Sequence, residues 1–238
     1  MDRKIVLVVV VLLLGVVAIA AAQGEFVNGA GGPGLHSTTL YAGQTIDAGT
    51  VSTWNSTKKF MLQVETSDDW LIDEVQVYVG YNTLRDPIPT KKGNPIPGKF
   101  PYKAEFGHPM GKHMLTLDLK DDLGFSWGGD KYRVLKEPTI AVHADLVKLD
   151  DKGKVIAEEG AWSFGPYTFE GSQWGWFFNY ILAHPRRGHF IDSPVIGLSY
   201  RGPTQEGITA DSSDEDGGGF LFFPDETIDF SVGTVSLG

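Results

Sequence analysis

The sequence predicts an all-β protein, an antiparallel β-sandwich followed by a short C-terminal β unit. Segments of alternating or continuous apolar residues recur along the chain, and turn residues bound each of them. The 30 glycines, 13 prolines, 14 phenylalanines, 8 tyrosines and 6 tryptophans favour many short strands joined by turns. We find no amphipathic pattern of helical period that extends beyond about two turns.

The first element, residues 1–24, is typical of an export signal. Arg3 and Lys4 precede an apolar run from Ile5 to Ala22 that ends in three alanines. This pattern predicts a cleaved signal peptide, although the same run is just long enough to cross a bilayer as a retained anchor. In both cases we expect the rest of the chain to be secreted or displayed at the cell surface, and to touch a membrane only through this segment if it is uncleaved.

The net charge narrows the classes of partner, and the absence of cysteine indicates what stabilises the fold. The formal net charge is −10, and removal of residues 1–24, with one acid and two bases, gives 18 − 29 = −11. Nucleic acids and anionic lipid surfaces repel such a chain, so we expect neither as a partner. Because the chain has no cysteine, its stability must come from a hydrophobic core rather than from disulfides.

The sandwich is expected over residues 38–188, after a glycine-rich flexible tether at residues 25–37. Its strand candidates are, in chain order, residues 38–54, 59–66, 71–81, 113–120, 139–149 and 173–182. Between the third and fourth candidates, residues 82–112 contain six prolines, which lack the amide that a central strand needs. We therefore expect a long loop there, lying on the sandwich and held by Phe100 and Tyr102.

A basic, proline-containing link precedes the C-terminal β unit, residues 189–238. Its strand candidates are residues 195–200, 207–211, 219–224 and 227–237. About fifty residues without cysteine bury too little surface to be stable alone. We therefore expect this unit to pack on the sandwich or to pair with another chain.

Four motifs within residues 69–180 resemble a β-rich module of exported bacterial and archaeal cell-surface proteins. The motifs are G-x-F-P-Y at residues 98–102, A-V-H-A at 141–144, A-W at 161–162 and W-x-x-x-F-x-Y at 174–180. The tail, from D-S-x-V-x-G-x-x-Y at residues 192–200 to G-x-x-x-L-G at 233–238, resembles a unit of bacterial lipoproteins and adhesin-like proteins. Its turn before Phe220 is longer and more acidic than is usual, and Asp225 and Glu226 stand where a glycine is common. The resemblance implies an extracellular surface role without catalysis.

Catalytic motifs are missing from the sequence. It has no G-x-S-x-G, Walker loop, H-E-x-x-H or dinucleotide fingerprint. Two histidine pairs, His108 with His113 and His184 with His189, offer imidazole ligands, but proline and glycine within them fix no metal geometry. His143, in an apolar segment, is expected to be a hydrogen-bonded strand residue. We therefore expect a protein that is not an enzyme.

Two features of the sequence concern carbohydrate, one as a bound ligand and one as a covalent modification. Four tryptophans could form a stacking platform for a glycan; these are Trp127, Trp162, Trp174 and Trp176. The sequence N-S-T at residues 55–57 is an acceptor for N-glycosylation in an exported chain.

The acidic stretch at residues 211–216 has two interpretations. Asp211, Asp214, Glu215 and Asp216 supply the oxygen ligands that calcium prefers, although their spacing differs from that of an EF-hand. The alternative is a solvated hairpin turn, since aspartate and glycine favour turns and four apolar residues follow. A bound calcium would serve as a staple or as a bridge between copies.

Together these features predict a non-catalytic surface structural protein. Strand pairing between copies would assemble it into a filament or layer, because edge strands leave amides unpaired. The alternative is an adhesin-like module that presents the proline-rich loop or a tryptophan face to a glycan, a peptide or another cell-surface partner.

Overall fold

The computed structural model describes residues 32–125, 127, 137–190, 195–210 and 217–237. This part of the chain is almost entirely β, and its one helical element is a 3-10 turn, η1 (Pro97–Lys99). The strands of the larger unit are β1 (His36–Ala42), β2 (Ile46–Asn55), β3 (Lys59–Thr66), β4 (Leu71–Gly80), β5 (Thr90–Lys91), β6 (Asn94–Pro95), β7 (Tyr102–Met110), β8 (Lys112–Asp118), β9 (Thr139–Leu149), β10 (Val155–Ser163), β11 (Tyr167–Thr168) and β12 (Trp176–Asn179). The predicted all-β fold class is confirmed.

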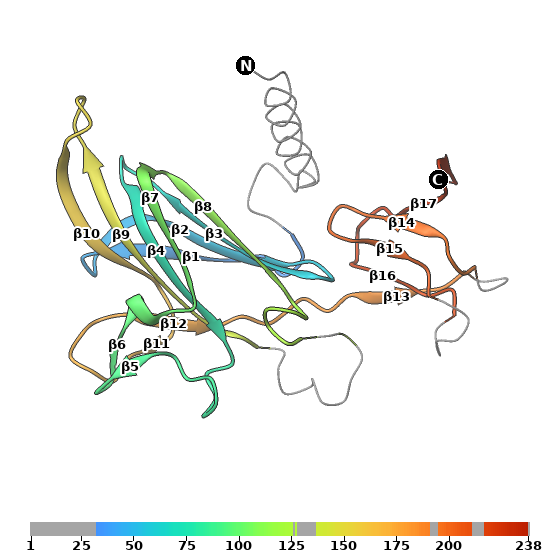
Figure 1. The fold of residues 1–238 in the computed structure, drawn as a ribbon, viewed down its shortest axis with the longest axis horizontal. Helices are drawn as coiled ribbons and strands as arrows, with labels where there is room; N and C mark the ends of the chain where they lie inside the picture. The colour runs from blue at the N-terminus through green and yellow to red at the C-terminus, as the bar shows by residue number, and fades with distance from the viewer. Residues whose placement is uncertain (1–31, 126, 128–136, 191–194, 211–216, 238) are drawn as a thin grey trace, which may run out of the picture.

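The larger unit is one antiparallel sheet folded into two layers (Figure 1). One layer has the order β7-β4-β9-β10, and the other has the order β1-β2-β3-β8. A short ladder from Leu40↔Ser163 to Ala42↔Ala161 joins β1 to β10 and so connects the layers. The short strand β12 extends the first layer beyond the end of β10, where Phe178 pairs with Ile140 of β9.

The core lies between the two layers. Along β9, Ile140, Val142, Ala144 and Leu146 are at most 1% exposed, and the residues between them face the outside. They pack in one cluster with alternate residues of β3 in the other layer, among them Leu62. This alternation is expected for a strand with one face on a core, where full burial of a Val, Leu, Ile or Phe side chain stabilises by about 1.5–3 kcal/mol.

The proline-rich segment is partly a loop and partly a strand. Residues 82–101 follow the expectation of a loop except for the short β5–β6 pair and η1, and Phe100 is buried in a second aromatic cluster. Residues 102–110, however, form β7 and pair with β4, so the prediction of a loop through residue 112 is wrong there. Proline is tolerated because β7 pairs with one neighbour only, and Pro109 falls where the register with β4 shifts.

The C-terminal unit consists of two small sheets, β13-β16 and β15-β14-β17-β18. Its strands are β13 (Arg186–Gly188), β14 (Ser199–Arg201), β15 (Glu206–Ile208), β16 (Phe220–Phe222), β17 (Asp229–Val232) and β18 (Val235–Ser236). Because β13 pairs with β16, residues 186–188 pair with this unit, whereas the sequence placed its start at residue 189. At the other end, β1 begins at His36, within the segment expected to be a tether.

Asn55 connects the end of β2 to the segment that leaves the sandwich. Its side chain is fully buried, and its Nδ2 donates to the carbonyl oxygens of Ser56 (3.0 Å) and Ala183 (3.1 Å). Its Oδ1 accepts from the hydroxyl of Tyr180 (2.9 Å) and from the N–H of Ala183 (2.8 Å). The amide of the N-S-T sequence is therefore inaccessible to glycosylation in the folded protein.

Replacement of Asn55 by alanine is expected to lower the free energy of unfolding by about 2–4 kcal/mol, because it leaves buried donors and acceptors of Tyr180 and Ala183 unpaired. Denaturant titration followed by tryptophan fluorescence measures this. Lys152→Ala, at an exposed position, is the control and should cost less than about 1 kcal/mol. A loss at Asn55 no larger than that of the control would contradict the assigned role.

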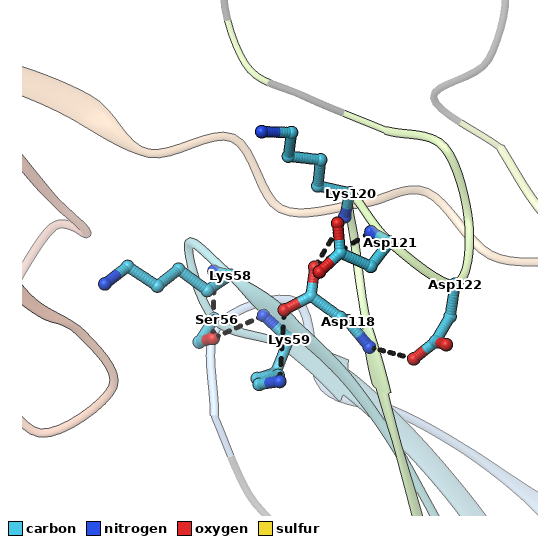
Figure 2. A network of polar contacts seen from close by, with 7 residues as sticks. All are labelled: Ser56, Lys58, Lys59, Asp118, Lys120, Asp121 and Asp122. Carbon is cyan, nitrogen blue, oxygen red and sulfur yellow. Dashed lines mark hydrogen bonds and ion pairs between the residues drawn. The ribbon is translucent and has the colours of Figure 1, made fainter.

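A polar network fixes the turn after β8 and ties it to β3 (Figure 2). Asp118 accepts hydrogen bonds from the backbone N–H groups of Lys120 (2.9 Å) and Asp121 (3.0 Å), and its Oδ2 accepts from Lys59 Nζ (3.0 Å). The bond from Asp121 N–H, followed by that from Lys59, holds the pKa of Asp118 below its ordinary value. The charged carboxylate is thus the form that the fold stabilises.

The lowered pKa of Asp118 predicts a loss of stability in acid. Its contribution is present above the unfolded pKa of about 3.9 and is lost as the pH falls through the folded value. We expect Asp118→Asn to lower stability at pH 7 and to flatten the decline below about pH 4. Chemical denaturation at a series of pH values tests this, with Asp121→Asn as control because it preserves the backbone N–H that Asp118 uses. An unchanged slope in Asp118→Asn would refute the assignment.

Candidate functional site

The four predicted calcium ligands, Asp211, Asp214, Glu215 and Asp216, lie outside the described residues. The chain on either side of them is closed by two backbone hydrogen bonds, from Ala210 N to Gly219 O and from Gly218 N to Ala210 O, both of 2.9 Å. Across the described ranges, no three histidine, aspartate or glutamate side chains are grouped to hold a metal ion. The calcium site therefore stays a prediction.

One histidine of each predicted pair, His113 and His184, has contacts of its own with neighbouring residues. His113 packs against the ring of Phe106, with centroids 5.2 Å apart, and burial lowers its pKa. His184 Nδ1 lies 2.7 Å from the carbonyl oxygen of Pro185, and the His184 ring meets Trp127 edge to face. His113 is thus packed against an aromatic ring, and His184 is exposed beside Trp127.

The four tryptophans do not form one platform. Trp127 packs beside the main core, and its Nε1 donates to the carbonyl oxygen of Thr57 at 2.6 Å. Trp162 is 4% exposed and belongs to the second aromatic cluster on the outer face of β4 and β9. Trp174 and Trp176 pack partly buried against that cluster, and Trp174 also lines a cavity.

This cavity, of about 600 Å³, lies on the outer face of the β4-β9-β10 layer. Its floor is set by strand register, because Gln76, His143 and Trp162 are direct cross-strand neighbours on β4, β9 and β10. Asp145 lies two residues along β9 on the same face. The walls come from the proline-rich segment and the segment before β12; their lining residues are Pro95, Pro97, Gly98, Ser172, Gln173 and Trp174.

Hydrogen bonds fix the orientation of the floor residues. A carboxylate only accepts, so the Gln76 amide directs Nε2 toward Asp145 Oδ2 at 3.3 Å. Its Oε1 then lies 2.6 Å from His143 Nδ1, which must carry the proton because an amide oxygen only accepts. In a neutral imidazole, Nε2 of His143 is consequently an acceptor. The expectation that His143 is a hydrogen-bonded strand residue is confirmed.

The surroundings keep His143 neutral. Burial lowers its pKa, and the nearby carboxylates of Asp145 and Glu74 oppose this shift. The ring also meets Trp162 edge to face, with centroids 4.9 Å apart. Near neutral pH the floor therefore presents one carboxylate and one neutral nitrogen acceptor side by side.

Titration of His143 should show an apparent pKa below the ordinary value of about 6.5. The unfolded chain then binds this proton more readily than the folded chain, so stability falls as the pH drops from about 6.5 toward the folded value. Asp145→Asn removes an opposing charge and should lower the pKa further. NMR of the imidazole ring measures both, with Asp151→Asn, at the distant β9–β10 turn, as control. A value at or above 6.5 would contradict the neutral assignment.

A second surface lies on the C-terminal unit. Val232 and Val235 pair across the β17–β18 hairpin, and Leu237 N donates to Phe230 O at 2.7 Å, so the apolar side chains of both strands share one face. Phe230 on this face packs edge to face against Phe220, with centroids 4.9 Å apart. Beyond it, Val232, Val235 and Leu237 remain 60%, 61% and 60% exposed.

Sequence reasoning missed Gln76 and Asp145 as parts of a site. The available signal was a polar residue on the outer face of otherwise apolar strands, V-Q-V-Y-V at residues 75–79 and V-H-A-D-L-V at 142–147. Gln76 lies 67 residues before His143 and 69 residues before Asp145 in the sequence. Their convergence therefore depends on strand pairing that local patterns do not specify.

Comparison with protein-family models, with curated proteins and with solved structures gives no match for this chain. Among the described residues, no helix has the length and apolar character needed to cross a membrane.

Proposed function

We propose that this chain is a non-catalytic structural protein, secreted or displayed at the cell surface, that assembles with copies of itself into a filament or layer. The observation that carries the proposal is the exposed aliphatic face of the β17–β18 hairpin. The export-type N-terminal sequence supports the location, and the missing catalytic motifs support a structural role.

The donor surface is the apolar face of the β17–β18 hairpin. In the described sheet β15-β14-β17-β18, β18 is the last strand and pairs with β17. Burial of Val232, Val235 and Leu237 against a partner would contribute roughly 3–5 kcal/mol in total. A second copy that covers these side chains would supply that burial.

The best acceptor on that second copy is the edge of β8. This strand pairs with β3 over seven residues in regular register, and no other described strand pairs with its outer edge. It has neither proline nor glycine. By contrast, β7, another end strand of the same sheet, contains Pro109 and pairs with β4 in an irregular register. Its inward-facing Leu115 is only partly buried and would be covered by an added strand.

Donor and acceptor are different surfaces on different units of the chain. Such a head-to-tail contact repeats from copy to copy and gives an open fibre unless the rotation closes a ring. Calcium at Asp211, Asp214, Glu215 and Asp216 is proposed to strengthen the contact as a bridge or staple.

The experiment is electron microscopy and analytical ultracentrifugation of the purified protein, with calcium and with chelator. We expect ordered filaments or sheets with calcium, fewer with chelator, and none in the double variant Val235→Lys/Leu237→Lys, because lysine on an edge strand opposes pairing. Thr234→Lys adds one such charge at the hairpin tip, outside the apolar face, and should assemble normally. A wild-type protein that stays monomeric at high concentration in both conditions would overturn the proposal.

A further inference from the structure

The cavity over β4, β9 and β10 presents hydrogen-bond acceptors at its floor. Asp145 carries a carboxylate, of which Oδ2 accepts from Gln76, and His143 Nε2 is an acceptor because Nδ1 holds the proton. Asp145 and His143 are two residues apart on one face of β9, and both line the cavity. A ligand that uses both acceptors must therefore bring two or more donors.

The wall of the cavity offers an aromatic surface. Trp174 is partly buried and is held by Trp176, with ring centroids 5.5 Å apart in an edge-to-face arrangement. Trp162 forms part of the floor beneath it. An indole face attracts C–H-rich apolar surface, and a site that combines such a face with a few fixed polar groups is typical of small-molecule recognition.

The rim is preorganised by contacts between two loops. Gln173 N donates to Asn94 Oδ1 at 2.8 Å, and Gly171 N donates to Gly93 O at 2.9 Å. The approach is so close that a Cβ at Gly171 would lie 2.1 Å from Asn94 Oδ1, and only glycine fits there. The side chains of Ser172 and Gln173, each able to donate and accept, are thereby held at the opening.

We propose that this cavity binds a neutral saccharide, whose adjacent hydroxyl groups donate to Asp145 and His143 while the C–H face of the sugar ring lies against Trp174. A sugar ring is the ligand that supplies neighbouring donors and an apolar face together. The volume of about 600 Å³ falls within the range of about 300–1,000 Å³ usual for small-molecule sites. This site is separate from the β17–β18 face and adds ligand recognition to a structural role.

A cationic amine, such as a lysine side chain, is the competing ligand, since a carboxylate beside an indole also attracts ammonium groups. The floor favours the saccharide because one oxygen of Asp145 is already paired with Gln76, and the second acceptor, His143, is uncharged.

The test is saturation-transfer NMR and calorimetry on the full chain. The probes are neutral oligosaccharides of glucose, mannose, galactose and N-acetylglucosamine, three to five units long, and a lysine-rich peptide. We expect at least one oligosaccharide to bind, and Trp174→Ala and Asp145→Asn each to weaken it by about tenfold or more. Tyr167→Ala removes an exposed aromatic side chain outside the cavity lining and should leave affinity unchanged.

Thermal unfolding of each variant shows whether a loss of binding reflects a loss of fold, and Trp174→Phe, which keeps an aromatic face, should restore part of the affinity. Trp174→Ala should assemble as the wild type does. Loss of saccharide binding can therefore be distinguished from loss of assembly. Binding of the peptide alone, of no oligosaccharide, or of a saccharide with equal affinity to Trp174→Ala would overturn the proposal.

Discussion

The pairing register between β4 and β9 determines both faces of the layer that they share. The ladder runs from Leu71↔Val147 to Gly80↔Thr139 and places Val75 and Val77 on the core side together with Val142 and Ala144. The same register puts Gln76 beside His143 on the outer side. A slip by one residue would turn every side chain of a strand to the opposite face. It would expose the valines and bury a glutamine and a histidine without their hydrogen-bond partners. Burial of the core residues therefore fixes the register and, with it, the positions of the residues on the cavity floor.

Strands with simple alternation were predictable from the sequence, and those with interruptions were not. Residues 59–66 and 139–149 match β3 and β9 at both ends, because each carries apolar residues with period two between clear turns. Strand β10 was missed, since two adjacent glutamates and Gly160 break its pattern. Strand β7 was not predicted because proline is unfavourable in a central strand. The sequence does not show that β7 is an edge strand or that Pro109 lies at a register shift.

The cavity shows the limit of local patterns more clearly. Trp162 and His143 attract attention as residue types, but Gln76 gains its meaning only from the hydrogen bonds it makes to His143 and Asp145. Asn55 shows the same limit in reverse. The sequence N-S-T indicated an exposed modification site, and tertiary contacts with Tyr180 and Ala183 made it a buried structural residue. Long-range contacts decided both cases, and a single sequence does not specify them.

The position of Asn55 also has a mechanical consequence. Its side chain binds both the N–H and the carbonyl oxygen of Ala183, close to the point where the chain leaves the sandwich for β13. Tension applied through the C-terminal unit would reach the sandwich at this point, and the paired bonds would resist it before any strand of the core was pulled. The hydrogen bonds of Asn55 would thus hold the exit of the sandwich and give the chain a defined first point of yield under force.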